Sequence, residues 1–148
     1  MPSKTTLKRA REDKREGKAP STQAGEFVKE EMDHIREGKH GARSTKQAIA
    51  IGLSKARRAG VKLPPPKKGT ASAATRKKAE RDYERGQSGK AARPSRKRSI
   101  AREKVLKREP RSAASHRNLS KQAKQAAAAR KRRGTASGGS GKRTGRKR

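Results

Sequence analysis

The sequence contains no cysteine and no tryptophan, and Phe27 and Tyr83 are the only aromatic side chains among its 148 residues. Without cysteine the chain has no disulfide framework, no thiolate nucleophile and no cysteine-based zinc site. No stretch approaches the roughly 18 consecutive apolar residues of a membrane span. The basic N-terminus is followed by no apolar segment, so we expect neither a membrane anchor nor a secretory signal.

Hydrophobic residues are also scarce, at 26% of the chain, whereas positive charge is in excess. There are 45 Lys and Arg residues against 13 Asp and Glu residues, which gives a net charge of +32. Low hydrophobicity with high net charge is typical of chains that bury too little surface to offset the entropy lost on folding. We therefore expect a mostly disordered chain with all-α elements, namely a short αα-hairpin at about residues 26–60 and transient helices in long basic tails.

The charge is distributed unevenly along the chain. Residues 1–25 and residues 26–63 each carry a net charge of +4, whereas residues 64–148 carry +24. We interpret the first part as a basic N-terminal arm, the second as a helical hairpin module and the third as a disordered cationic tail rich in Lys, Arg and Ala. Weaker helix signals outside the hairpin show no apolar face wide enough to dock, and they cover residues 7–16, 76–85, 100–109 and 119–133.

Apolar periodicity predicts the first helix of the hairpin. Val28, Met32 and Ile35 recur at i, i+4 and i+7, with Phe27 beside them. Gly38 stands where a left-handed residue would end the helix. This pattern predicts one apolar stripe on a helix from about residue 26 to residue 37.

The second helix has clearer start and stop signals. Ser44 and Gln47 fit an S-x-x-Q capping box, in which each side chain satisfies a backbone N–H at the helix start. Gly60 supplies the stop, and three prolines follow it. The apolar stripe between these signals consists of Ile49, Leu53 and Ala56.

Two helices of this length cannot bury their apolar side chains fully by themselves. We therefore expect the hairpin to pair with a partner, and a homodimer through residues 26–63 is one such pairing. The small residues Ala48, Gly52 and Ala56 of the second helix would permit close helix–helix approach.

The cationic residues carry the functional prediction, because a large positive excess attracts the phosphate lattice of nucleic acids. A single basic cluster is also what a solvated charge run looks like, so the prediction depends on all the clusters together. The chain has too few aromatic residues for base stacking, and it has no zinc-finger spacing. Both observations favour contacts with phosphates over recognition of the base sequence. The residues that we expect to bind nucleic acid are Arg43, Lys46, Lys55, Arg57, Arg58, Arg96, Lys97, Arg98, Lys107, Arg108, Arg130, Lys131, Arg132, Arg133, Lys142, Arg143, Arg146, Lys147 and Arg148.

Nothing in the sequence points to catalysis. The only imidazoles are His34, His40 and His116, and none of them has a metal-binding partner set at a recognisable spacing. The Gly-Lys steps lack the glycine and the Ser or Thr that a phosphate-binding loop needs. We expect no catalytic residue, no metal, no cofactor and no small-molecule substrate.

The stretch from Gly38 to Gly60 contains the pattern S-x-K-Q-A-I-A-I-x-L-S-x-A-R-x-A-G. It resembles a module of small, basic, uncharacterised bacterial proteins that are often labelled DNA-binding. The Lys, Arg and Ala content of the tail is similar to that of bacterial linker-histone-like proteins. These resemblances imply a cytoplasmic, nucleoid-associated, histone-like protein that binds DNA. An RNA- or ribosome-associated protein and an adaptor that docks a protein partner through the hairpin are the alternatives.

Overall fold

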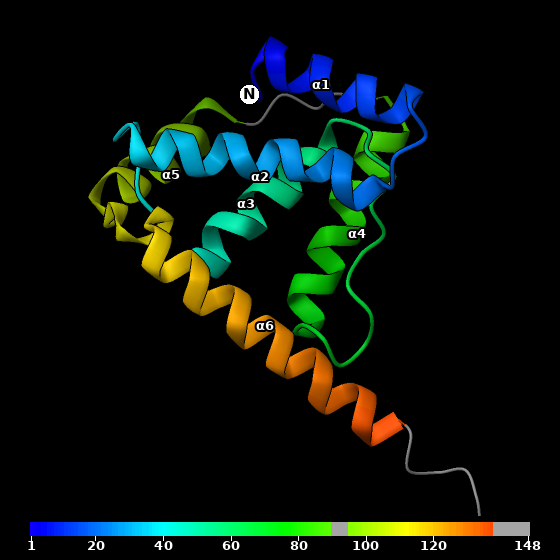
Figure 1. Ribbon diagram of the computed structural model, residues 1–148. Coiled ribbons are helices and arrows are strands. Elements are labelled where there is room, and N and C mark those ends of the chain that lie inside the picture. The colour runs from blue at the N-terminus through cyan, green and yellow to red at the C-terminus, as the bar shows by residue number, and fades with distance from the viewer. Residues whose placement is uncertain (90–94, 138–148) are drawn as a thin grey trace, which may run out of the picture.

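Helix follows helix along residues 1–89 and 95–137, the part of the chain that the computed structural model describes, with side chains up to residue 134 (Figure 1). The expectation of a mostly disordered chain is therefore wrong, because these residues form a packed all-α structure. Among them no helix is both long enough and apolar enough to cross a bilayer. The elements are α1 (Lys4–Arg15), α2 (Pro20–Arg36), α3 (Thr45–Arg58), α4 (Ala73–Gln87), α5 (Arg96–Arg108), the 3-10 helix η1 (Arg111–Ala114) and α6 (His116–Ser137).

The two helices predicted for the hairpin are α2 and α3, and local hydrogen bonds explain where α3 begins and ends. The Ser44 hydroxyl accepts from the Gln47 N–H at 3.2 Å, and the side-chain oxygen Oε1 of Gln47 accepts from the Arg43 N–H at 2.7 Å. At the other end Gly60 has a φ of +90°, and its N–H donates to the Arg57 carbonyl. The first helix begins earlier than predicted, at Pro20, whose ring suits the first turn of a helix.

The two helices pack so closely that one contact is between backbones. A Cβ atom at Gly52 would lie 2.7 Å from the Val28 Cα. Ala48 and Ala56, one turn away on either side, are completely buried. The small-residue face of α3 thus packs against α2 of the same chain. This face is therefore not available to a second copy, and it no longer supports the predicted homodimer.

Two small apolar clusters form around this helix pair, and residues outside the predicted hairpin complete both. The first contains Met32, Ile35, Ala42, Ala48, Ala113 and Ala114, with Val28, Ile49 and Leu119 packed against it. The second contains Ala10, Ala24, Phe27, Ala56 and Val61, with Leu7, Leu53 and Leu63 packed against it. Leu7 and Ala10 come from α1, and Leu119 comes from α6.

The prediction that helices outside the hairpin lack an apolar face wide enough to dock is therefore wrong for α1 and α4. Ala10 of α1 is 6% exposed and Ala79 of α4 is 5% exposed, so alanine faces suffice for burial. At the far end of α4 the backbone of Gly86 lies against the Arg57 carbonyl, where no Cβ would fit. Small residues let helices approach closely, so a narrow apolar stripe is enough to dock a helix and a wide apolar face is not required.

Substituting Gly52→Ala is expected to destabilise the protein by about 1 to 3 kcal/mol, since the added methyl group overpacks the contact with Val28. The matched control is Gly25→Ala on α2, where nothing lies within 4 Å of the new Cβ. That change is expected to stabilise by about 0.5 to 1 kcal/mol, because alanine loses less entropy in a helix. Urea denaturation followed by circular dichroism measures both values. Equal effects at the two glycines would contradict the packing described here.

Candidate nucleic-acid interface

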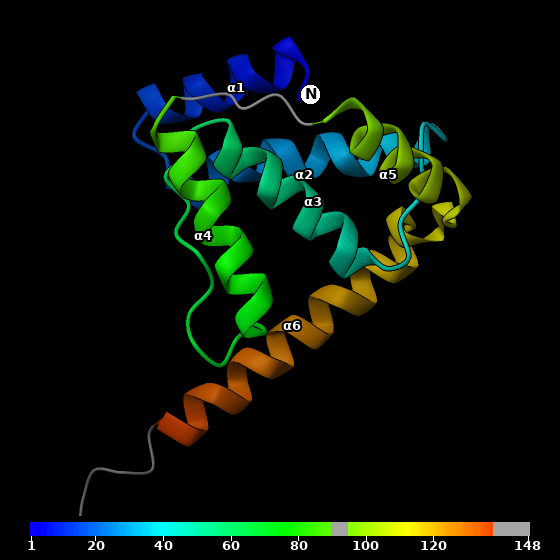
Figure 2. The same ribbon diagram turned by 180° about the vertical axis from the view of Figure 1, so that it is seen from behind.

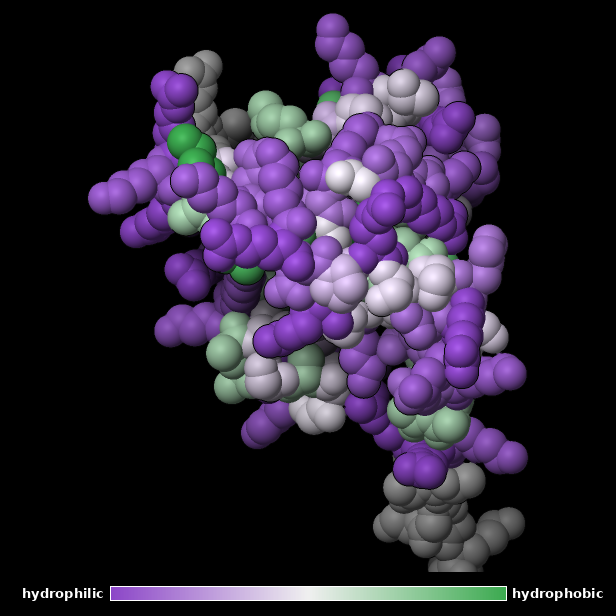
Figure 3. Space-filling view, turned by 90° about the vertical axis from the view of Figure 1, so that its left-hand side faces the viewer, coloured by the Kyte–Doolittle hydropathy of each residue, from purple (hydrophilic) through white to green (hydrophobic). Residues whose placement is uncertain are grey.

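Helix α5 is strongly cationic and largely exposed. Its 13 residues include seven Lys and Arg residues and one acidic residue, Glu103, and none of the 13 is buried. Ile100 and Val105 are large hydrophobic side chains that it exposes to solvent, by 44% and 57%. The side of the molecule seen in Figure 3 is mostly hydrophilic, with a few hydrophobic residues scattered over it. Helix α5 therefore presents positive charge to solvent.

A short segment anchors α5 and α6 to the core. The Gly41 N–H donates to the Leu106 carbonyl at 2.8 Å, and the Ala42 N–H donates to the Pro110 carbonyl at 3.1 Å. The Thr45 hydroxyl donates to the Ala113 carbonyl at 2.6 Å. The side chains of Ala113 and Ala114 are buried in the first cluster. Backbone hydrogen bonds and two alanines thus fix the point from which both cationic helices leave.

Helix α6 has two different faces. Leu119 packs against the first cluster, and α6 runs from there along the edge of the molecule in both views (Figures 1 and 2). Arg117, Lys121 and Lys124 are exposed and lie at i, i+4 and i+7, on the face opposite Leu119. The 22 residues of α6 include seven Lys and Arg residues and no acidic residue. One face holds the helix in place, and the other is a row of cations.

Most of the predicted site residues that the structure describes are exposed. Five of the nineteen lie outside the described residues, namely Lys142, Arg143, Arg146, Lys147 and Arg148. The exposed ones are Arg43, Lys46, Arg58, Arg96, Lys97, Arg98, Lys107, Arg108, Arg130, Lys131, Arg132 and Arg133.

Two predicted site residues are engaged inside the fold. Lys55 Nζ lies 2.6 Å from Glu31 Oε2, and the Lys55 side chain is only 17% exposed. Arg57 is buried and donates to the Leu63 carbonyl and to the Pro64 carbonyl, which fixes the chain as it leaves α3. Burial lowers the pKa of Arg57, although the nearby carboxylate of Asp82 acts in the opposite direction. Arg58 is exposed, and its Nε also lies 3.8 Å from Asp82 Oδ1.

Sequence reasoning missed the row of cations on α6, because it searched for consecutive basic residues. Arg117, Lys121 and Lys124 are spaced by four and three residues, which is the spacing of one helical face. Applying the periodicity test to charged residues as well as to apolar ones would have found them.

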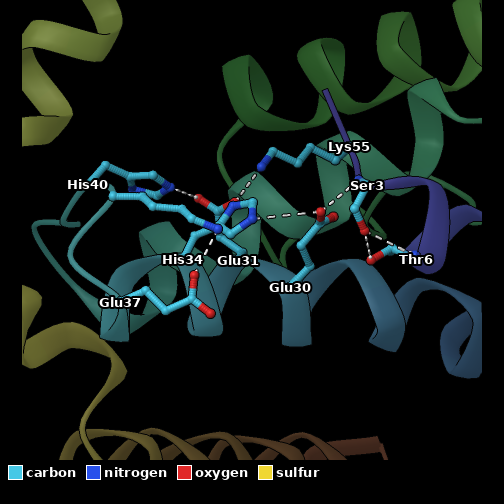
Figure 4. Close-up of polar contacts among 9 residues, drawn as sticks. Ser3, Thr6, Glu30, Glu31, His34, Glu37, His40 and Lys55 are labelled. Carbon is cyan, nitrogen blue, oxygen red and sulfur yellow. Dashed lines mark hydrogen bonds and ion pairs between the residues drawn. The ribbon is translucent and has the colours of Figure 1, made fainter.

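A second polar cluster lies between α2 and the loop that follows it (Figure 4). Glu31 is completely buried, and His40 Nε2 lies 3.3 Å from Glu31 Oε1. A ring nitrogen of His34 lies within 4.8 Å of a ring nitrogen of His40 and of a carboxylate oxygen of Glu31. We expected no metal-binding partner set for any histidine, and residue spacing could not reveal this cluster, because the turn at Gly38 brings His40 back against α2.

The environment of His34 favours its neutral form. Burial lowers the pKa of His34, and the positive charges of Lys55 and Lys39 lower it further. Its Nε2 lies 3.8 Å from Glu30 Oε1, and that carboxylate also accepts from the Ser3 N–H at 2.7 Å. A neutral imidazole has a lone pair that is available to a metal ion or a hydrogen-bond donor.

Residues 15–68 match a family of unknown function, DUF6496. The match covers the last residue of α1, all of α2 and α3 and the segment that follows, and it stops before α4. The description of this family gives it no function, so it lends no support to the DNA-binding label that the resemblance of residues 38–60 implied. No curated protein matches the chain. No solved structure matches it either.

Substituting Thr45→Val is expected to cost about 1 to 3 kcal/mol, because the buried Ala113 carbonyl loses its donor. Hydrogen exchange should also speed up in η1 and in the first turn of α6, which this contact holds. The control is Thr70→Val, whose exposed hydroxyl donates to the Lys67 carbonyl and whose loss should cost less than about 0.5 kcal/mol. Unchanged exchange in η1 would show that the hydrogen bond does not anchor the cationic helices.

Replacing Lys55 by Met is expected to destabilise the protein by about 3 kcal/mol, since it leaves the buried Glu31 carboxylate without its ion pair. The comparison is Lys107→Met, which removes an exposed pair with Glu103 and should change stability by less than about 0.5 kcal/mol. Denaturant midpoints at neutral pH give both values. A change of less than about 1 kcal/mol at Lys55 would contradict the expected cost of leaving a buried carboxylate unpaired.

Proposed function

We propose that the protein binds nucleic acid through phosphate contacts, largely without sequence preference, and that duplex DNA is the preferred ligand. One observation carries this proposal. Helices α5 and α6 each contain seven Lys and Arg residues, and the two helices together contain one acidic residue, Glu103. Each cation that neutralises a phosphate releases condensed counterions, and this release supplies most of the affinity in binding of this kind.

The length of α6 suits an extended polyanion. Its 22 residues span about 33 Å at about 1.5 Å per residue. A DNA duplex carries one phosphate charge per roughly 1.7 Å of its axis, so a cationic helix finds phosphates within reach in any register. Such contacts position a protein on the duplex without reading its bases.

The anchoring of these helices also supports the proposal. Because η1 docks in the core, α5 and α6 present their cations from a folded body. Side chains on a formed helix lose less conformational entropy on binding than those on a disordered tail. The cations in this proposal thus belong to two anchored helices, whereas the sequence alone placed them in disordered tails.

The aromatic side chains favour a duplex over a single strand. Proteins that bind single-stranded RNA or DNA usually stack bases on aromatic rings. Phe27 is 1% exposed and belongs to the second apolar cluster, which leaves only the half-buried Tyr83. A duplex ligand and the bacterial resemblance together suggest a nucleoid-associated role in the cytoplasm.

The row of cations on α6 provides the test. The triple substitution Arg117→Gln, Lys121→Gln and Lys124→Gln should weaken binding to random duplex DNA. It should also reduce the slope of log K against log salt by about 2 to 3, since each lost phosphate contact contributes about 0.9. Fluorescence anisotropy at four or more salt concentrations measures the slope.

The matched control removes the same charges from α1, through Lys4→Gln, Arg11→Gln and Lys14→Gln. These residues are exposed, and α1 lies on the opposite side of the body from α6 (Figures 1 and 2). We expect the slope to change by less than about 1 in the control. Equal slopes for the two triple variants would contradict an interface on α6, and absence of DNA binding at low salt would refute the proposed function. Competition with ribosomal RNA at each salt concentration tests the choice of ligand, because a strong preference for RNA would overturn duplex DNA.

A further inference from the structure

A buried carboxylate oxygen in this protein has no hydrogen-bond partner. Glu31 is completely buried; its Oε2 accepts from Lys55 at 2.6 Å, whereas its Oε1 accepts no hydrogen bond. A buried charged oxygen without a partner is costly, so such an atom indicates a ligand that completes its environment.

The ring of His40 faces this oxygen. Its Nδ1 lies 3.0 Å from the Gly41 carbonyl, which can only accept, so Nδ1 carries the proton. In the neutral ring Nε2 then presents a lone pair, and it lies 3.3 Å from Glu31 Oε1, which also presents lone pairs. Two lone pairs at this distance repel each other unless a proton or a metal cation lies between them.

We propose that Glu31, His34 and His40 bind a divalent transition-metal ion, with Zn²⁺ as the representative ion. Two imidazole nitrogens and one carboxylate oxygen form a known zinc donor set that leaves a fourth position to water. Ligands around a tetrahedral zinc at about 2.0 to 2.2 Å lie about 3.3 to 3.5 Å from one another, which is the separation of the His40 and Glu31 atoms. The third ligand atom, from His34, lies within 4.8 Å of a ring nitrogen of His40 and of a carboxylate oxygen of Glu31, and needs a shift of about 1 Å.

The surroundings of the three residues suit a bound metal. The hydrogen bond from His40 Nδ1 to a backbone carbonyl is the contact that usually orients a metal-binding histidine. Lys55 holds the other oxygen of Glu31. The His34 and His40 side chains are 22% and 15% exposed, so an ion can enter from solvent.

The local charge also admits a cation, although the protein as a whole is strongly positive. Figure 4 shows the carboxylates of Glu30, Glu31 and Glu37 in this cluster. The cations beside them are Lys55, paired with Glu31, and Lys39, paired with Glu37 at 2.7 Å. Three carboxylates against two ammonium groups leave one negative charge when both histidines are neutral.

Metal binding at this site would stiffen the loop between α2 and α3. Glu31 and His34 lie on α2, and His40 lies on the loop. The next residues, Gly41 and Ala42, make the backbone hydrogen bonds that hold the end of α5. This site would therefore act on the segment that positions the cationic helices, but metal binding does not depend on their function.

Calorimetric titration of the untagged, EDTA-treated full chain with Zn²⁺ tests the site. We expect one equivalent to bind, and His40→Gln to weaken the affinity at least about 10-fold. The matched control is His116→Gln at the exposed start of α6, which should leave the affinity unchanged. Zn²⁺ binding that is equally tight in the wild type and in His40→Gln would overturn the proposal, as would absence of binding to the wild type.

Co²⁺ absorption separates loss of a ligand from loss of folding. Tetrahedral coordination gives the wild type strong visible bands, which His34→Gln and His40→Gln should both reduce while circular dichroism remains helical. Mg²⁺ should compete weakly, because it prefers oxygen ligands in an octahedral arrangement. Identical Co²⁺ spectra for the wild type and the two folded variants would refute the proposed ligands.

Discussion

Close packing between α2 and α3 is the contact on which the rest of the fold depends. The chain has few large hydrophobic side chains, so it gains burial by bringing backbones together at Gly52 and Val28. Dispersion forces fall steeply with distance, and small residues in tight contact therefore give much of the stability that larger side chains would give. Once this pair is formed, an apolar cluster at each end receives α1 on one side and the η1–α6 segment on the other.

Negative and positive charges lie in different parts of the fold. Glu30 and Glu31 lie inside, where the Ser3 N–H and the Lys55 ammonium contact them. The cations of α5 and α6 lie outside, with little acidic charge near them. Because 11 of the 13 acidic residues precede α5 in the sequence, the exposed helices keep nearly all of their positive charge. This separation underlies both the proposed phosphate binding and the proposed metal site, which have opposite electrostatic requirements.

Signals that act within one turn of helix could be read from the sequence. The capping box at Ser44 and the stop at Gly60 appear where they were predicted, since their hydrogen bonds join residues close together in the chain. Docking was predicted poorly, because average hydrophobicity does not register a single buried alanine such as Ala79. The anchor at Ala113 was missed for a similar reason. Its backbone carbonyl accepts a hydrogen bond from the Thr45 hydroxyl, and this contact leaves no pattern in the sequence.

The sequence by itself determined the all-helical character, the two ends of α3 and the large positive charge, since these follow from local hydrogen bonding and from composition. Only the tertiary structure decided which cations face solvent, as the contrast between the buried Arg57 and the exposed Lys121 shows. It also decided that Glu31 and His40 meet. Both outcomes depend on contacts between residues far apart in the chain or across a turn, and the geometry of such contacts is set by how the helices pack.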